Sequence, residues 1–183
     1  MNKLLLSVFA FFLLTVTASA QTTMMEKDHS TGEVKLNFLN TILLGSVEIG
    51  YEHFIEKDQS IGVEVHFNDR FAYVGTNDNK DFSATSILAS YNFYFVGDEN
   101  GKLFISPFAK YRFGDFTETE NNITNTVDMN SFLIGLGGGY KWVFNDKFAF
   151  GPYASIARGF SKEVNDRFTA VEFKAGFSVG YRF

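Results

Sequence analysis

The chain has 183 residues, of which 45% are hydrophobic and 17% aromatic, and its formal net charge at pH 7 is −5. It contains no cysteine, which excludes disulfides, thiolate metal sites, a cysteine nucleophile and lipidation on cysteine. The negative charge argues against a nucleic-acid partner. The length is that of one domain, and 23 Phe and 8 Tyr beside a single Trp favour strands over helices.

Residues 1–20 have the pattern of a cleavable export signal. Lys3 supplies a positive charge, the apolar core runs from Leu4 to Val16, and Ala18-Ser19-Ala20 is a small-residue cleavage site. The apolar core is shorter than the roughly 20 residues that a membrane-spanning helix needs. We therefore expect residues 1–20 to be removed and residues 21–32 to form an N-terminal periplasmic segment.

From residue 33 onward, bulky apolar residues alternate with small or charged ones, which predicts strands with two different faces. The pattern is strictest in Val171–Phe183, where every odd position is apolar or aromatic and every even position is charged, Ser or Gly. In 103–116 the faces are ambiguous, because Phe104 and Phe108 share a face with Lys110 and Arg112. The expected strands are 34–43, 47–55, 60–68, 85–96, 103–116, 131–144, 148–160 and 171–183.

The connections between these segments alternate between short and long. Short polar turns are expected at 56–59, 97–102 and 145–147, and longer loops at 69–82, 116–128 and 161–170. This asymmetry is typical of outer-membrane barrels, whose short turns are periplasmic and whose longer loops are extracellular. The first hairpin departs from it, because Asn40–Gly45 is brief and apolar where a long outer loop is expected.

Side-chain size indicates which face points inward. A soluble lipocalin-like barrel would enclose the apolar face, whereas a membrane barrel would turn it outward. An eight-stranded barrel has an interior just wide enough for side chains. Gly135, Gly137 and Gly139 would fit there, whereas aromatic rings from every strand would overfill it. The predicted fold of residues 33–183 is therefore an all-β, eight-stranded antiparallel up-and-down transmembrane barrel.

Aromatic residues gather at the strand ends that adjoin the short turns. Trp142, Phe144, Phe148 and Phe95 are expected to form an aromatic girdle at the membrane interface.

Two motifs resemble those of known proteins. Tyr181-Arg182-Phe183, at the end of the strictest strand, resembles the C-terminal signal by which outer-membrane proteins are recognised for barrel insertion, here Tyr181 and Phe183. The mature chain resembles the small barrels of the OmpA/OmpX type. Residues 33–52 (EVKLNFLNTILLGSVEIGYE) resemble the opening of a family of small outer-membrane barrels of unknown function. The resemblance implies a place in the cell outer membrane, with lipid, lipopolysaccharide and the barrel-assembly machinery as partners, and it transfers no catalytic residue.

Charged residues recur on the inward face of the predicted strands. Because buried charges must be paired, we interpret them as an ion-pair network that closes the lumen. The alternative is a narrow gated channel for ions or small solutes, in which Lys110 or Arg112 exchanges partners. Glu172 with Lys174, and Glu48 with Glu52, are the first pairs to test. The expected network consists of Lys35, Glu48, Glu52, Glu64, His66, Lys110, Arg112, Lys141, Glu172, Lys174 and Arg182.

A lipid-modifying enzyme is the third hypothesis. Glu64 and His66 share the inward face, and Ser86 or Ser90 could lie beside them on the next strand. No HExxH, G-x-S-x-G, phosphate-loop or EF-hand motif is present. We therefore expect a non-enzymatic protein without metal or cofactor, with a role in envelope integrity or surface interaction.

The outer loops are the expected site of any surface partner. Loops 69–82 and 116–128 are the candidates, and the acidic residues near the second loop could also hold divalent cations that bridge to lipopolysaccharide. Phe71 and Tyr73 continue the alternation of 60–68, so that hairpin is expected to project as a ribbon. We expect the protein to be a monomer.

Overall fold

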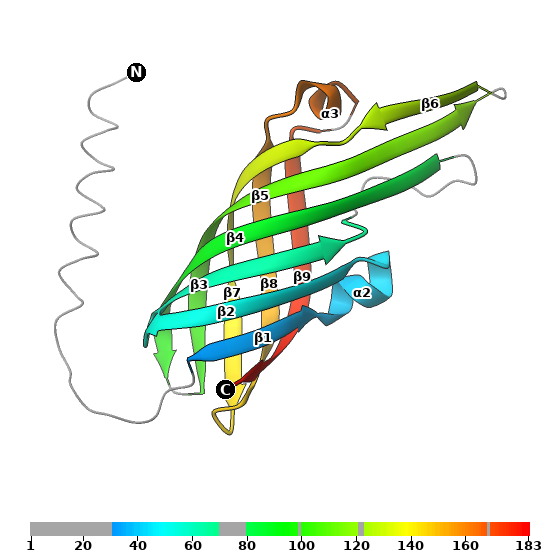
Figure 1. Cartoon of the computed structure of the whole chain (residues 1–183). Helices are drawn as coiled ribbons and strands as arrows, with labels where there is room; N and C mark the ends of the chain where they lie inside the picture. Colours follow the sequence, from blue (N-terminus) through cyan, green and yellow to red (C-terminus); the bar gives the residue numbers. More distant parts are fainter. Residues whose placement is uncertain (1–30, 70–79, 99, 121–122, 168) are drawn as a thin grey trace, which may run out of the picture.

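The computed structural model describes residues 31–69, 80–98, 100–120, 123–167 and 169–183 (Figure 1). The expected export signal, nearly all of the segment 21–32, and Phe71 and Tyr73 lie outside these residues. None of the helices in the described residues is long and apolar enough to span a bilayer. The elements are β1 (Gly32–Asn37), α2 (Phe38–Leu44), β2 (Val47–Glu56), β3 (Gln59–Phe67), β4 (Lys80–Asp98), β5 (Gly101–Glu120), β6 (Ile123–Asp128), β7 (Ser131–Phe144), β8 (Phe148–Gly159), α3 (Lys162–Arg167) and β9 (Val171–Arg182).

Eight of the strands form a closed wall. Each pairs antiparallel with its neighbours in the order β1, β2, β3, β4, β5, β7, β8 and β9, and β9 pairs back to β1 from Glu33↔Arg182 to Asn37↔Ser178. Gly32 and Phe183 exchange backbone hydrogen bonds of 3.0 and 2.9 Å at this seam. The predicted eight-stranded up-and-down barrel is therefore confirmed.

The apolar face of the wall is outside. Ile134, Phe173 and Trp142 are exposed, while Arg112 and Lys141 are buried in the lumen. The two ambiguous residues Phe104 and Phe108 point inward, where they pack against the glycine face of β7: a Cβ on Gly139 would lie 3.0 Å from the Phe104 ring, and one on Gly135 would collide with Phe108. The glycines of β7 therefore make room for two rings from β5.

The short turns lie where the sequence places them, at one end of the barrel, together with the start of β1 and the end of β9 (Figure 1). In the β7–β8 turn, Asn145 and Asp146 have φ of 53° and 54°. A positive φ at both central positions is what a type I′ hairpin turn requires. By the convention of outer-membrane barrels this is the periplasmic end.

The first expected strand, 34–43, is wrong in its second half. β1 ends at Asn37, and α2 follows at once. The Asn37 side chain caps the helix by accepting from the Asn40 backbone N–H at 3.3 Å, and Gly45 ends it with φ 65°. The polar residues Asn37, Asn40 and Thr41 have i, i+3, i+4 spacing, a helical period that the strand interpretation overlooked.

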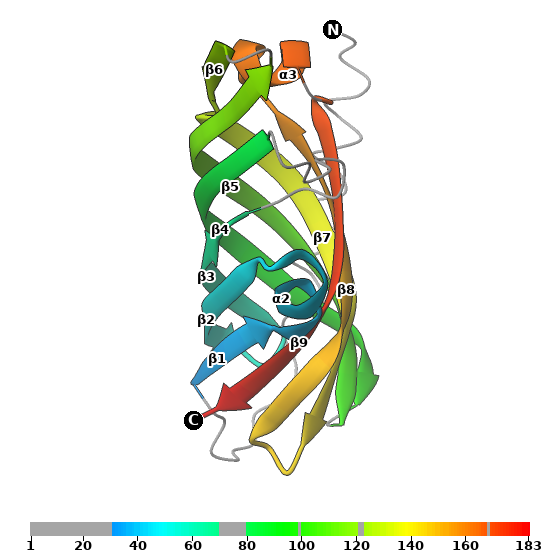
Figure 2. The same ribbon diagram turned by 90° about the vertical axis from the view of Figure 1, so that its right-hand side faces the viewer.

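The expected loop 116–128 is also wrong, because it is a β-hairpin. β5 runs on to Glu120, and β6 returns along it from Glu120↔Ile123 to Asp115↔Asp128. Pairs of threonine hydroxyls face each other across the hairpin, Thr117 with Thr126 at 3.3 Å among them. Beyond the pair Phe116↔Val127, Thr, Glu and Asn predominate on both strands, so the alternation that reveals a half-buried strand is lacking. β5 and β6 extend above the outer ends of β2, β3 and β4 (Figures 1 and 2).

Candidate functional site

The charged residues of the lumen form two groups. The first, which we call the inner cluster, lies toward the periplasmic end and consists of Glu33, Glu52, Lys141 and Arg182. Lys141 Nζ lies 3.0 Å from Glu33 Oε1 and 2.8 Å from Glu52 Oε2, and Arg182 Nε donates to Glu33 Oε2 at 2.9 Å. The Ser60 hydroxyl donates to Glu52 Oε1 at 2.5 Å. Four strands, β1, β2, β7 and β9, are thereby tied together across the lumen.

The second group, the outer cluster, lies toward the opposite end and consists of Glu48, His66, Asp69, Lys110, Arg112, Glu172 and Lys174. Arg112 holds Glu172 with two bonds, of 2.5 and 2.8 Å, and donates from Nε and Nη2 to Asp69 Oδ2 at 3.2 and 3.1 Å. Lys110 Nζ lies 2.8 Å from the same Asp69 oxygen. Such bidentate, charge-assisted contacts are among the stronger hydrogen bonds in proteins.

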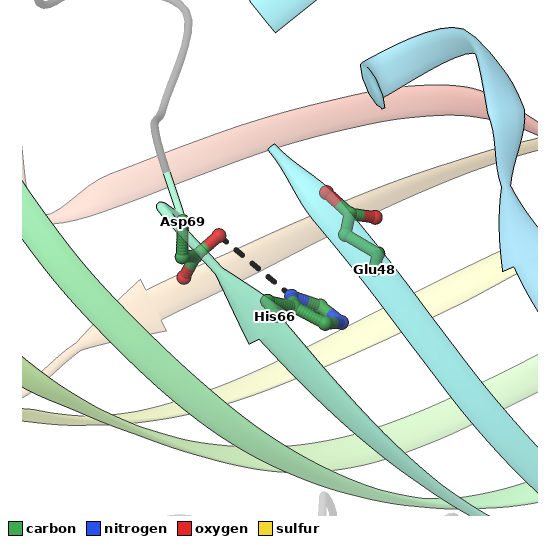
Figure 3. A group of neighbouring side chains, drawn as sticks. All are labelled: Glu48, His66 and Asp69. Atoms are coloured by element: carbon green, nitrogen blue, oxygen red, sulfur yellow. Dashed lines mark ion pairs between the residues drawn. The ribbon is translucent and has the colours of Figure 1, made fainter. Parts of the chain in front are cut away.

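Glu48, His66 and Asp69 form a potential metal-ligand set, since one ligand atom of each lies within 4.8 Å of the others (Figure 3). A cation already occupies this position. The ammonium of Lys174 lies 2.5 Å from Glu48 Oε1, 3.1 Å from Asp69 Oδ1 and 3.4 Å from His66 Nδ1. The three side chains therefore serve as acceptors for the chain's own lysine.

Lys35 and Glu64 connect the two clusters. Lys35 Nζ lies 2.7 Å from Glu64 Oε1 and 3.7 Å from Glu52 Oε2 of the inner cluster. Glu64 Oε2 in turn lies 3.0 Å from His66 Nε2. A cavity of about 90 Å³ lies along this connection, and its walls combine polar groups such as Asn92 and Ser106 with inward-facing rings of β4 and β5.

Within the described residues, the ion pairs of the lumen join equal numbers of acidic and basic groups. Each has an oppositely charged partner at 2.9 Å or less. The acids are Glu33, Glu48, Glu52, Glu64, Asp69 and Glu172, and the bases are Lys35, Lys110, Arg112, Lys141, Lys174 and Arg182. Apart from His66, the charges of these described residues therefore balance.

The structure brings together all eleven residues expected in the network, but it changes the pairs. Glu172 pairs with Arg112 rather than Lys174, and Lys174 pairs with Glu48. Glu48 and Glu52 belong to different clusters, each with its own cation. Opposite charges meet across the lumen, and the residues on one strand do not pair with each other in these two cases.

Sequence reasoning missed Glu33 and Asp69. Glu33 stands two residues before Lys35 in β1, so strand alternation could have found it. By contrast, alternation would turn Asp69 outward from β3. Asn68, with φ 54°, breaks the extended backbone and turns Asp69 into the lumen, where it is 1% exposed. Nothing in the residue pattern signals this turn.

The lumen has an apolar cover at its outer end. Ala84, Phe116, Met129 and Val164 form a buried cluster that joins β4, β5 and α3 above the ionic groups. Leu133, fully buried on the inward face of β7, lies next to Gly159.

The expected girdle residues point outward at the periplasmic end. Trp142, Phe144, Phe148 and Phe95 are exposed, and the Trp142 and Phe150 rings lie 5.7 Å apart. Tyr181 meets Phe148 edge-to-face with ring centroids 5.5 Å apart. The terminal Phe183 stacks on Tyr51 at 6.4 Å, so the C-terminal motif is part of the outer surface of the closing seam.

Solved structures with a similar fold are small outer-membrane barrels. The N-terminal β-barrel domain of Pseudomonas aeruginosa OprF is 13% identical, with a TM-score of 0.57 over 85% of this chain and 100% of that chain. Neisserial surface protein A is 15% identical, with a TM-score of 0.53 over 82% and 91%. Ail, the attachment invasion locus protein of Yersinia pestis, is 12% identical, with a TM-score of 0.50 over 87% and 100%.

No curated protein sequence matches the chain significantly. Residues 7–182, nearly the whole sequence, match a family described as a protein of unknown function, DUF3575. The closed wall and the apolar exterior, together with the similar folds, are those of a barrel in the outer membrane of a Gram-negative cell. The chain therefore belongs to the DUF3575 family, and it is a small outer-membrane β-barrel.

Proposed function

We propose that this protein is a closed, non-enzymatic barrel that supports envelope integrity or presents a surface for interaction, and that it does not conduct. The observation that carries the proposal is the charge-balanced network of the lumen. A solute on its way through must separate pairs such as Arg112–Glu172, whose two bonds measure 2.5 and 2.8 Å. Removing one partner of a buried pair costs about 3–5 kcal/mol, and both clusters would have to open.

The apolar cover adds a second obstacle to ions. Phe116, Met129 and Val164 are 0–3% exposed and lie over the outer cluster. Apolar constrictions exclude water and ions even when they are wide enough for them. Opening a path would therefore require movement of α3 as well as rearrangement of ion pairs.

The surroundings of His66 argue against the enzyme hypothesis. The ring is 2% exposed, and its two nitrogens lie 3.0 Å from Glu64 Oε2 and 3.4 Å from Lys174 Nζ. The Ser86 hydroxyl donates to Asp69 at 2.6 Å rather than to the imidazole. A general base must reach the proton that it removes, and a lipid on the outside of the wall does not contact this ring.

A narrow gated channel is the second candidate, and the central cavity is the observation that favours it. Its volume of about 90 Å³ exceeds the roughly 10–15 Å³ that one water molecule needs, so it has room for water. Hydrated polar groups between two ionic clusters would form the middle of a pore if both clusters rearranged.

Single-channel recording of the purified protein in planar bilayers separates the two candidates. We expect a flat baseline for the unmodified chain. The double variant R112A/E172A removes one buried pair without changing net charge, and it shows whether the assay detects an opened lumen; Ile134→Ala on the lipid-facing side is the matched control. Stepwise currents from the unmodified chain would refute the closed lumen in favour of the channel.

The envelope and surface roles can be separated in cells that lack the protein. The hairpin of β5 and β6 stands beyond the wall, so replacing residues 117–126 by a tight turn shortens it without altering the lumen. If the role is structural, the shortened protein restores resistance to detergent as well as the complete chain does. If the role is surface interaction, the complete chain alone restores function. A shortened barrel is checked for folding by its heat-dependent mobility on gels.

We also propose how the protein reaches the outer membrane. The export-signal pattern of residues 1–20, and the outward position of Tyr181 and Phe183 at the periplasmic end, support export followed by insertion by the barrel-assembly machinery. Outer-membrane lipid and lipopolysaccharide are then the immediate surroundings. N-terminal sequencing of the mature protein should begin at Gln21, and an unprocessed N-terminus in the membrane fraction would contradict this step.

A further inference from the structure

The first strand is too short to cross the membrane alone. β1 has 6 residues, whereas a transmembrane strand needs about 9–11. At about 3.3 Å per residue and a tilt of about 40°, six residues advance roughly 15 Å through an apolar band about 25 Å tall. Its neighbours β2 and β3 have 10 and 9 residues, which is just sufficient. The chain therefore leaves β1 at Asn37 while still at the depth of the lipid tails.

The helix that follows has one polar and one apolar side. Asn37 and Asn40 are buried and donate to Glu48 at 2.6 and 3.2 Å, and Tyr153 donates to the same carboxylate at 3.1 Å. The opposite side of α2 is apolar and exposed, by 38–67% of each side chain: Phe38, Leu39, Ile42 and Leu43. Residues 36–47 contain no charged side chain at all.

The backbone at both ends of α2 is hydrogen-bonded within the protein. The Asn40 N–H donates to the Asn37 side chain, and the Asn40 carbonyl accepts from the Gly45 and Ser46 N–H groups. The Gly45 carbonyl accepts from the Asn68 amide at 3.1 Å. Such internal pairing is what lipid demands, because the hydrocarbon offers no hydrogen-bond partners. A water-exposed loop has no such need.

The apolar side of α2 also continues the lipid-facing surface of the wall. Leu36 on β1 pairs with Ile49 on β2, and both are exposed on the exterior directly below the helix. In the views of Figures 1 and 2, α2 lies well below β6 and α3, and it packs beside β9. From these observations we propose that α2 is embedded in the outer leaflet, where Phe38, Leu39, Ile42 and Leu43 contact lipid acyl chains while Asn37 and Asn40 seal the lumen behind them.

The absence of native cysteine allows a direct test. Single-cysteine variants of the full chain, folded into phosphatidylcholine vesicles, carry an environment-sensitive fluorophore at Leu43→Cys, at Phe173→Cys on the lipid-facing side of β9, or at Lys162→Cys on α3. Lipids with brominated acyl chains quench labels in the hydrocarbon, and iodide quenches labels in water. Heat-dependent mobility on gels verifies that each variant is folded.

We expect brominated lipid to quench the label at position 43 at least about half as much as the label at 173, while the label at 162 responds to iodide alone. A label at 43 that iodide quenches as strongly as the label at 162 would place α2 in water and overturn the proposal. A label at 43 that neither agent quenches would also overturn it, because a second copy or another protein would then cover the helix. Repeating the measurement at Ile42→Cys guards against an effect of one substitution.

Discussion

Two sides of this barrel end differently at the same outer rim. On the short side, β1, β2 and β3 have 6, 10 and 9 residues, and the connection from β1 to β2 is an uncharged helix. On the tall side, β4 and β5 have 19 and 20 residues, and the rim carries the polar β6 and the helix α3, with four charged residues among its six. On the proposal that α2 lies in lipid, the uncharged connection meets the membrane and the charged one meets water.

The buried sides of the two helices differ in the same sense. α2 turns asparagines inward to the ionic groups, whereas α3 turns Val164 inward to Phe116 and Met129. The buried side of α2 is therefore polar, and the buried side of α3 is apolar. In the proposed closed barrel, polar contacts seal the lumen on the short side and apolar contacts seal it on the tall side.

The largest expected effect comes from the ion pairs that join the two sides. Arg112→Ala on β5 removes the closest cation of the buried Glu172 and one of the three cations that contact Asp69, and we expect a loss of about 3–5 kcal/mol in the free energy of unfolding. Urea titration of the barrel in vesicles, followed by Trp142 fluorescence, measures the loss. R112A/E172A should recover part of it. Equal losses in the single and double variants would show that the pair itself does not matter.

A comparable loss is expected when the lysine between Glu48, His66 and Asp69 is removed. Lys174→Met removes the ammonium that lies between the three potential ligands, so a divalent ion such as Zn²⁺ can take its place. At a hundredfold excess over its dissociation constant, the ion would restore about 2.7 kcal/mol. We expect Zn²⁺ to raise the unfolding midpoint of this variant but not of the unmodified chain. A similar shift in both proteins would mean that Zn²⁺ binds elsewhere.

The smallest expected effect comes from placing a lysine on α2 or on α3 and comparing the two losses in the free energy of unfolding. Ile42→Lys on α2 places a charge at the outer part of the lipid surface, where we expect a loss of about 1–2 kcal/mol, between the midplane and interface values for barrels. The matched change on α3, Asp166→Lys, should stay within about 0.5 kcal/mol because it is a surface substitution in water. Equal effects measured by urea titration would remove the distinction between the two sides.

Sequence alone predicts the wall of this barrel well, because alternation reports directly on a surface between lipid and lumen. Val171–Phe183 shows it without exception, and β9 occupies Val171–Arg182. The rim is less predictable. The sequence did not predict α2, because the helix is short and apolar and a strand would have the same composition. It did not predict the β5–β6 hairpin, because polar residues predominate on both of its faces.

The sequence predicts which charged residues line the lumen, but it does not predict which of them form ion pairs with each other. Alternation identifies which side chains point inward, such as Lys141 and Arg112, but the tilt and register that bring β5 to β9 across the barrel are not written in any one strand. Asp69, which contacts Lys110, Arg112 and Lys174, depends on a single left-handed residue before it. A periodic pattern therefore could not predict that Asp69 lies at the centre of the outer cluster.

The accessibility of the lumen to water-soluble reagents tests the closed barrel most directly. Ser106 lies in the cavity between the clusters, 9% exposed, and donates to Asn92 at 2.6 Å, so Ser106→Cys is a nearly isosteric reporter in a chain without other thiols. A small cationic methanethiosulfonate is added to the folded variant in vesicles, with Lys162→Cys as the reactive control. We predict that position 106 stays unmodified until the barrel is denatured. Modification of the folded protein at a rate near that of position 162 would contradict the closed lumen.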